Sequence, residues 1–135
     1  MVTRFLVDTN VWIHYLKGVN TIVESRLRST PAEQITVCSV IWAELLHGAE
    51  KYALRDARVA KVVKTLAPYH SFEFGNSTAP HYADIRHRLE LAGGLVGPHD
   101  IMIASIAREH GLTVVSSDAG FRQIPGLLVE DWTVS

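Results

Sequence analysis

Cysteine is almost absent from this sequence, since Cys38 is its single example in 135 residues. One cysteine cannot form a disulfide within the chain, so folds built on disulfide frameworks are excluded. We therefore expect a reducing, cytoplasmic setting. The sequence also opens without the basic and apolar pattern of a secretory leader, which we take as a second indication of that setting.

Long hydrophobic runs and a surplus of charge are also lacking. No run approaches the roughly 20 apolar residues that cross a bilayer, so we expect no membrane span. The 13 Lys and Arg against 14 Asp and Glu argue against a protein that holds nucleic acid by a blanket of positive charge. They do not exclude an enzyme that reaches phosphates through bound cations. The hydrophobic content of 47% is typical of a folded protein, and we expect one domain over residues 1–135.

Apolar strands alternate with amphipathic helices along the chain. The pattern predicts strands at 4–8, 34–38, 69–74, 112–115 and 127–129, and helices at 11–17, 21–29, 40–50, 55–67, 77–92 and 98–110. Thr9 or Asn10 is expected to cap the first helix, and residues 116–125 are expected to form a loop. Strands separated by helices favour parallel pairing with crossover connections. The predicted fold is thus α/β, with three α/β/α layers around a central parallel sheet.

Four acidic residues fall where such a fold collects its ligands. Asp8 ends the first strand, and Asp118 follows the strand at 112–115. Asp100 lies in the first turn of the helix after a glycine-rich loop, and Glu44 lies just over one turn into the helix after the second strand. Ligands of open parallel sheets bind at the carboxyl ends of the strands, near the point where strand order reverses. We therefore expect these four side chains to converge on one pocket.

Such a pocket would need a cation. Two carboxylates about 4 Å apart repel each other by about 4 kcal/mol at an effective dielectric of 20. Carboxylates gathered together must therefore take up protons or bind metal. Oxygen ligands alone favour hard ions such as Mg²⁺ or Mn²⁺, which can activate water and stabilise the leaving oxygen of a phosphodiester.

Several short motifs together resemble the PIN-domain family, and within it the VapC-like toxins of VapBC-type toxin–antitoxin systems. The resemblance covers nearly the whole chain, and its strength lies in the set of motifs and their spacing. The acidic motifs are Val7-Asp8-Thr9-Asn10, Ser39-x4-Glu44-Leu45, Gly97-x2-Asp100 with Ile103-Ala104, and Ser116-x-Asp118. The C-terminal part that is similar to these toxins is Phe121-x2-Ile124-Pro125-Gly126-Leu127 followed by Glu130-Asp131-Trp132.

The resemblance implies a PIN fold and an endoribonuclease that depends on Mg²⁺ or Mn²⁺ and cleaves structured RNA, such as transfer or ribosomal RNA. It also implies a homodimer and a cognate antitoxin protein. The catalytic and metal-binding residues that it carries over are Asp8, Glu44, Asp100 and Asp118. Asn10 would orient a carboxylate, and Ser116 would support the last acid. Some relatives carry Asn in place of that acid, so Asp118 is the residue for which direct ligation is most open.

Simpler interpretations exist for each acid. Asp8 could be only a helix cap, and Asp118 only a turn residue. The helix dipole favours Asp100 in a first turn whatever its function, and Glu44 could be an ordinary solvated helix residue. The residues leave one metal ion or two open, as well as binding through water by Glu44 and Asp118.

Other classes of protein also place acids at strand ends. A receiver-type phospho-acceptor needs an acid pair after the first strand and a late lysine, whereas this chain has Asp8 alone and no lysine after Lys64. A phosphohydrolase of the DxD type needs a second acid where Asn10 stands. The main alternative is a catalytically inactive PIN-type module that only binds RNA or protein, and the presence of all four acids argues against it.

Overall fold

The fold is a five-stranded parallel sheet with helices on both faces. The computed structural model describes residues 2–51 and 53–135. In chain order, the elements of this described part are β1 (Phe5–Val7), α1 (Thr9–Lys17), α2 (Thr21–Ser29), the 3₁₀ helix η1 (Ala32–Gln34), β2 (Ile35–Cys38), α3 (Ser39–Glu50), α4 (Arg55–Leu66), β3 (His70–Phe72), α5 (Ala79–Ala92), α6 (Pro98–His110), β4 (Thr113–Val115), the 3₁₀ helix η2 (Ala119–Gln123) and β5 (Val129–Glu130). The predicted α/β class with a central parallel sheet is confirmed.

The strand order β3-β2-β1-β4-β5 places β1 at the centre of the sheet. β1 pairs with β2 and with β4, and every pairing is parallel. The chain moves from β1 outwards to β3, and later returns beside β1 and moves outwards the other way. Strand order therefore reverses between β1 and β4, and open sheets of this kind bind ligands at that point.

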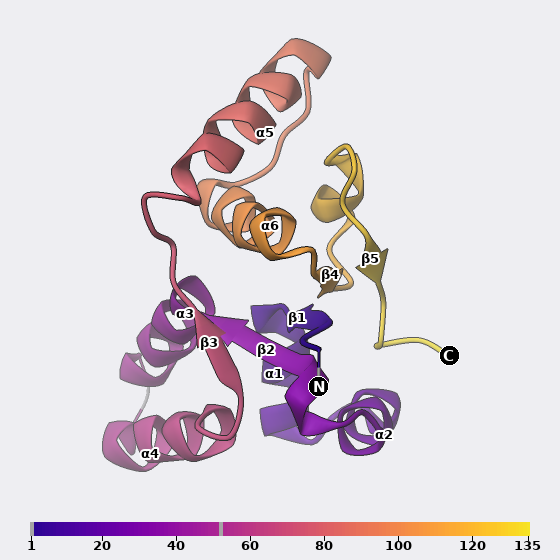
Figure 1. Ribbon diagram of the computed structural model, residues 1–135. Coiled ribbons are helices and arrows are strands. Elements are labelled where there is room, and N and C mark those ends of the chain that lie inside the picture. Colours follow the sequence, from indigo (N-terminus) through magenta and orange to yellow (C-terminus); the bar gives the residue numbers. More distant parts are fainter. Residues whose placement is uncertain (1, 52) are drawn as a thin grey trace.

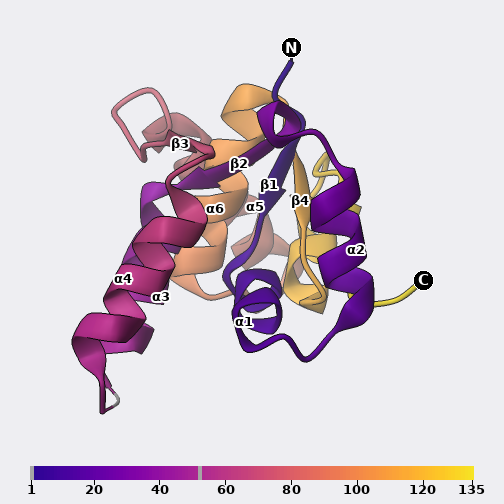
Figure 2. The same ribbon diagram turned by 90° about the horizontal axis from the view of Figure 1, so that it is seen from below.

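Two helical layers enclose the sheet. Figure 1 shows α5 and α6 on one side and α1, α2 and α4 on the other. Seen from below in Figure 2, α1, α2 and α4 lie in front of the strands. Helix α3 contacts both α1 and α6, so it joins the two layers. The predicted three-layer arrangement is thus confirmed.

Burial explains why the central strands read as continuous apolar runs. Every residue of β1, β2 and β4 is buried, as expected for parallel strands covered on both faces. Helix α6 contributes six buried residues and packs beside β4. By contrast, β3 is an edge strand with two exposed residues, which accounts for its weaker sequence pattern.

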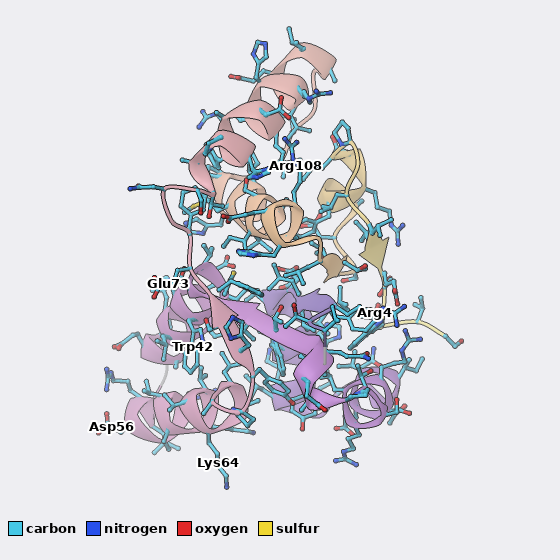
Figure 3. All side chains as sticks on the ribbon, viewed as in Figure 1. Arg4, Trp42, Asp56, Lys64, Glu73 and Arg108 are labelled. Atoms are coloured by element: carbon cyan, nitrogen blue, oxygen red, sulfur yellow. The ribbon has the colours of Figure 1, made fainter. Side chains whose placement is uncertain are left out.

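Helix α5 stands farthest from the sheet, with α6 between them (Figure 1). Arg108 of α6 lies between the two helices in Figure 3, and its guanidinium is 2.7 Å from the Asp84 carboxylate of α5. On the opposite side of the molecule, Asp56 and Lys64 project outwards from α4 (Figure 3). Among the described residues, no helix combines the length and apolar character that crossing a membrane requires.

Most predicted boundaries match within two residues, and two helices match completely. These are Thr21–Ser29, where the Asn20 side chain accepts from two amides, and Pro98–His110, which ends at Gly111 in the left-handed region (φ 68°). The loop predicted at 116–125 contains η2, and the last strand is Val129–Glu130 rather than 127–129. The predicted strand is wrong at both ends. Leu127 and Leu128 precede the strand, and the strand includes Glu130, whose charge interrupts the apolar pattern.

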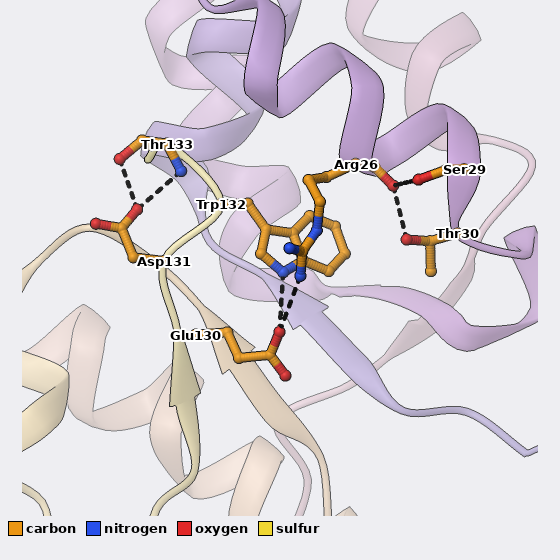
Figure 4. Close-up of polar contacts among 7 residues, drawn as sticks. All are labelled: Arg26, Ser29, Thr30, Glu130, Asp131, Trp132 and Thr133. Carbon is orange, nitrogen blue, oxygen red and sulfur yellow. Dashed lines mark hydrogen bonds and ion pairs between the residues drawn. The ribbon is translucent and has the colours of Figure 1, made fainter. Parts of the chain in front are cut away.

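Trp132 packs the C-terminal segment against the rest of the fold (Figure 4). This indole is 1% exposed, and its ring meets the Phe5 ring edge-on at 5.0 Å. The Arg26 guanidinium lies 5.1 Å from the Trp132 ring centroid and 3.1 Å from the Glu130 carboxylate. The same carboxylate accepts a hydrogen bond from the indole N–H. The tail thus covers the end of the core beside β1.

We expect Trp132→Ala to lower the free energy of unfolding by about 3–5 kcal/mol, because it removes a large buried side chain and leaves a cavity. Urea denaturation measures this change. Val134→Ala is the matched control in the same segment, since Val134 is 58% exposed and should shift stability by no more than about 0.5 kcal/mol. Equal effects of the two substitutions would contradict the structural role of the tail.

Candidate active site

The candidate active site lies at the carboxyl edge of the sheet, where strand order reverses. Asp8 directly follows β1, and Ser116 and Asp118 follow the neighbouring β4. The Asp8 amide donates to the Val115 carbonyl at 2.9 Å, so the two chain segments leave the sheet side by side. Residues more than 100 positions apart are brought together in this way.

Asp8 is a buried acid with a hydroxyl partner. Its side chain is 3% exposed, and the Ser116 hydroxyl donates to its Oδ2 at 2.9 Å. Burial raises the pKa of Asp8 to about 6. The Ser116 hydroxyl and the Thr9 amide oppose that rise, while the charges of Glu44 and Asp118 add to it. A carboxyl kept in this environment is one that a cation would stabilise.

The interpretation of Asp8 as a helix cap is correct in position but does not account for its side chain. Asp8 does occupy the N-cap position of α1, but its side chain makes no capping hydrogen bond. The expectation that Thr9 or Asn10 would cap this helix is wrong, since Thr9 is already its first residue. The helix begins two residues before the predicted range because the Asp8 carbonyl accepts the first helical hydrogen bonds.

Asp118 combines a turn role with a place in the acidic pocket. Its amide donates to the Ser116 hydroxyl at 3.0 Å, and its Oδ1 accepts from the Gly120 amide at 2.8 Å, which starts η2. The turn interpretation is therefore correct as far as it goes. The same carboxylate also raises the pKa of Asp100, both by its charge and through a side-chain hydrogen bond. Ser116, buried at 1% exposure, thus supports two of the acids.

Asp100 is the acid whose pKa the other three acids raise. It lies in the first turn of α6, and burial raises its pKa to about 7. The charges of Asp8, Asp118 and Glu44 add to that rise, in that order. Together with the hydrogen bonds of Ser116 to Asp8 and Asp118 and of Thr9 to Glu44, these interactions place the four acids near one edge of the sheet.

Glu44 reaches the pocket from α3 and is held on both of its oxygens. The Thr9 hydroxyl donates to Oε1 at 2.7 Å, and His99 Nδ1 lies 3.6 Å from Oε2. The Glu44 side chain is 28% exposed. It is therefore not the ordinary solvated helix residue of the simpler interpretation.

The expected supporting role of Asn10 has no counterpart in the structure. Asn10 is exposed, and no hydrogen bond joins its side chain to a carboxylate in residues 2–51 and 53–135. Thr9, its neighbour, holds a carboxylate instead. Sequence reasoning missed Thr9 because its partner lies 35 residues away on another helix, and no local pattern signals that contact.

A cavity of about 880 Å³ adjoins the acids between α1, α3 and α4. Its walls are largely apolar and include Ile13, Leu16, Val62 and Phe74. Lysines such as Lys17 and Lys51 also line it. Of the four acids only Glu44 lines this cavity, together with Thr9, Asn10 and His99. The cavity therefore meets the acidic pocket at Glu44.

The donor chemistry of the pocket fits a hard divalent cation. Four carboxylates and no cysteine or histidine cage are what Mg²⁺ or Mn²⁺ prefers. Burial raises the pKa values of Asp8 and Asp100, and the charges of the neighbouring acids add to that rise. Within the described part of the chain, however, no three His, Cys, Asp or Glu side chains are already arranged to hold an ion. A cation held by these acids would need their side chains to turn towards one another.

Comparison with known proteins gives a consistent result. The PIN domain family model matches residues 5–127. The tRNA(fMet)-specific endonuclease VapC of Salmonella typhimurium is 32% identical over 130 residues, which cover 96% of this chain and 98% of that protein. Ribonuclease VapC2 of Haemophilus influenzae is 31% identical, with the same coverage.

Solved structures agree with these relatives. The crystal structure of DNA-bound VapBC from Salmonella typhimurium contains a chain that superposes with a TM-score of 0.91 and 31% identity, covering 97% of this chain and 99% of that one. A chain of FitAcB from Neisseria gonorrhoeae superposes with a TM-score of 0.83 and 25% identity, covering 95% and 97%. The agreement extends over nearly the full length of each chain.

Raised carboxyl pKa values make stability fall as pH rises when no metal is bound. Asp100 keeps its proton up to about pH 7 in the folded chain but only to about pH 4 when unfolded. The folded state thus binds more protons in this window, and the free energy of unfolding declines with increasing pH. We expect Asp100→Asn, which cannot ionise, to flatten the decline and to add about 2 kcal/mol at about pH 8, a figure reduced for partial exposure.

Urea unfolding in the presence of a chelator, repeated across this pH range, measures the effect. The matched control is Glu33→Gln, which neutralises an exposed acid far from the pocket and should keep the wild-type slope. If Asp100→Asn kept that slope as well, the four acids would not interact as described.

Proposed function

Because this chain belongs to the PIN domain family, we propose that it is an endoribonuclease and the toxin of a toxin–antitoxin pair. Relatives that are 31–32% identical to this chain are named ribonucleases or tRNA(fMet)-specific endonucleases, and the match covers almost their entire length. The observation that carries the proposal is the hydrogen bonding at one sheet edge, where Ser116 bonds both Asp8 and Asp118, and Thr9, the residue after Asp8, bonds Glu44. Structured RNA, in particular transfer RNA, is the proposed substrate.

The finer part of the proposal is dependence on Mg²⁺ or Mn²⁺. Asp8, Asp100 and Asp118 would hold the cation, and Glu44 would contribute directly or through water. A bound divalent cation activates water and offsets charge on the phosphodiester. Without one, four carboxylates repel an RNA phosphate, so the charge of the pocket itself favours a cation-dependent enzyme.

The protein's own groups orient this pocket. Ser116 donates to Asp8 Oδ2 and accepts from the Asp118 amide, so a single hydroxyl fixes two acids relative to each other. Burial of Asp8 keeps bulk water away from one side of the pocket. Asp100 and Glu44 are partly exposed, so RNA would reach the pocket at these two residues. An inactive binding module is not favoured, since it would have no use for four mutually repelling carboxylates.

We expect purified protein to cleave RNA only when Mg²⁺ or Mn²⁺ is added, and Asp8→Asn or Asp100→Asn to lower the rate by at least about 100-fold. Each substitution keeps the size of the side chain and removes its charge. Cleavage of labelled transfer RNA, followed on denaturing gels with and without a chelator, is the measurement.

Glu33→Gln, purified in the same way, is the control and should cleave as wild type does. Equal activity in wild type and both Asp→Asn variants would identify a contaminating nuclease and overturn the proposal. Cleavage that continues in the presence of the chelator would overturn only the proposed metal dependence, and not the ribonuclease function.

An antitoxin protein is the proposed inhibitor, since solved relatives are VapBC complexes. We assign its docking site to the cavity between α1, α3 and α4. Apolar walls suit the apolar face of a helix, and the surrounding lysines Lys17 and Lys51 suit acidic residues on its flanks. Homodimerisation stays a prediction from the family resemblance.

Filling the cavity should weaken antitoxin binding. Gly48 lies in α3 on the cavity wall, and a Cβ placed there meets nothing within 4 Å. We expect Gly48→Trp to reduce affinity for the cognate antitoxin by about 10-fold or more. Titration calorimetry measures the affinity.

Gly75→Trp provides the matched control, because a Cβ at Gly75 also meets nothing within 4 Å and this residue does not line the cavity. Its affinity should equal that of wild type. Undiminished binding by Gly48→Trp would place the antitoxin elsewhere on the molecule.

A further inference from the structure

Thr9 makes a contact that spans the two helices flanking the acidic pocket. Its hydroxyl, on the first residue of α1, donates to Glu44 Oε1 on α3 at 2.7 Å. The contact is partly buried, and a hydrogen bond to a carboxylate at this distance is of the strong, charge-assisted kind. The residue therefore fixes a side chain well outside its own helix.

Glu44 needs such a partner because it lies beside other carboxylates and at the edge of an open cavity. Its charge acts on both Asp8 and Asp100, and like charges in a partly buried pocket favour separation. The adjoining cavity gives the Glu44 side chain room to turn away from them. Its other neighbour, His99, is 67% exposed and 3.6 Å distant, so it offers a weaker hold.

Thr9 is well suited to this task by its position and shape. It directly follows Asp8, so the same turn of chain that delivers Asp8 to the pocket also delivers the hydroxyl. A β-branched side chain at the start of a helix has few rotamers, which keeps the hydroxyl aimed in one direction. Asn10, one residue later, is exposed and makes no comparable contact with the acids in the described residues.

We propose that Thr9 is a positioning residue, which holds the Glu44 carboxylate beside Asp8 and Asp100 and so completes the four-acid pocket. This inference rests on the proposed ribonuclease function. Thr9 does not touch the reacting atoms. It acts through Glu44, and its loss lets Glu44 turn into the cavity.

The test compares Thr9→Val, which keeps the shape and removes the hydroxyl, with Thr9→Ser, which keeps the hydroxyl. We expect Thr9→Val to lower kcat by about 10- to 100-fold with little change in KM, and to weaken Mn²⁺ binding by a similar factor. Thr9→Ser should stay close to wild type in both. RNA cleavage kinetics and calorimetric Mn²⁺ titration give the two measurements.

Thr21→Val is the matched control. Thr21 is likewise the first residue of a helix, is exposed, and has no side-chain hydrogen bond within the described residues, so its valine variant should behave as wild type. Circular dichroism melting of every variant separates loss of positioning from loss of folding, and a Thr9→Val chain that melts like wild type is expected.

A double substitution shows whether Thr9 acts through Glu44. In a Glu44→Gln background, Thr9→Val should cause little further loss of Mn²⁺ affinity, because the carboxylate that it positions is gone. An undiminished further loss, or equal kinetics for Thr9→Val and wild type, would overturn the inference. Failure of the wild-type chain to cleave RNA would instead overturn the proposed function, so the two failures are distinguishable.

Discussion

Repulsion among four carboxylates at one edge of the sheet is the constraint around which this structure is organised. Asp8 and Asp100 have pKa values raised to about 6 and about 7, which burial and the neighbouring acids cause. A chain under selection for stability alone would gain by losing these acids, because neutral residues of similar size would remove the repulsion. The pocket therefore indicates a function, and the proposed divalent cation would relieve the repulsion among these carboxylates when it binds.

The rest of the fold supplies the rigidity that holds this arrangement. Asp8 and Ser116 extend from β1 and β4, which are buried and hydrogen-bonded neighbours, so neither can drift from the other. Asp100 is carried by α6, whose buried residues pack it firmly beside the sheet. Two hydroxyl groups complete the arrangement, since Ser116 donates a hydrogen bond to Asp8 and Thr9 donates one to Glu44. Placing a site on strands and packed helices gives it more precision than loops could.

The sequence predicted the elements and the four acids, but not the contacts between them. Apolar runs and helix-ending signals placed Thr21–Ser29 and Pro98–His110 correctly, because these signals act within a few residues. The convergence of Asp8 with Asp118 followed from the general rule for parallel sheets. The partnership of Thr9 with Glu44 could not be foreseen, since it depends on how α3 leans across α1. For the same reason the sequence predicts that Asn10 orients a carboxylate, whereas its side chain is exposed in the structure.

Glu44 links the two properties expected of a toxin, catalysis and its control. It is the one acid among the four that also lines the apolar cavity, and its partners Thr9 and His99 line the cavity as well. A helix seated in that cavity would come within reach of this carboxylate, while Asp8 stays buried behind it. An inhibitor could then act by disturbing Glu44 alone, without entering the centre of the pocket. On this argument, the place of Glu44 on both the acidic pocket and the cavity is what would make the enzyme controllable.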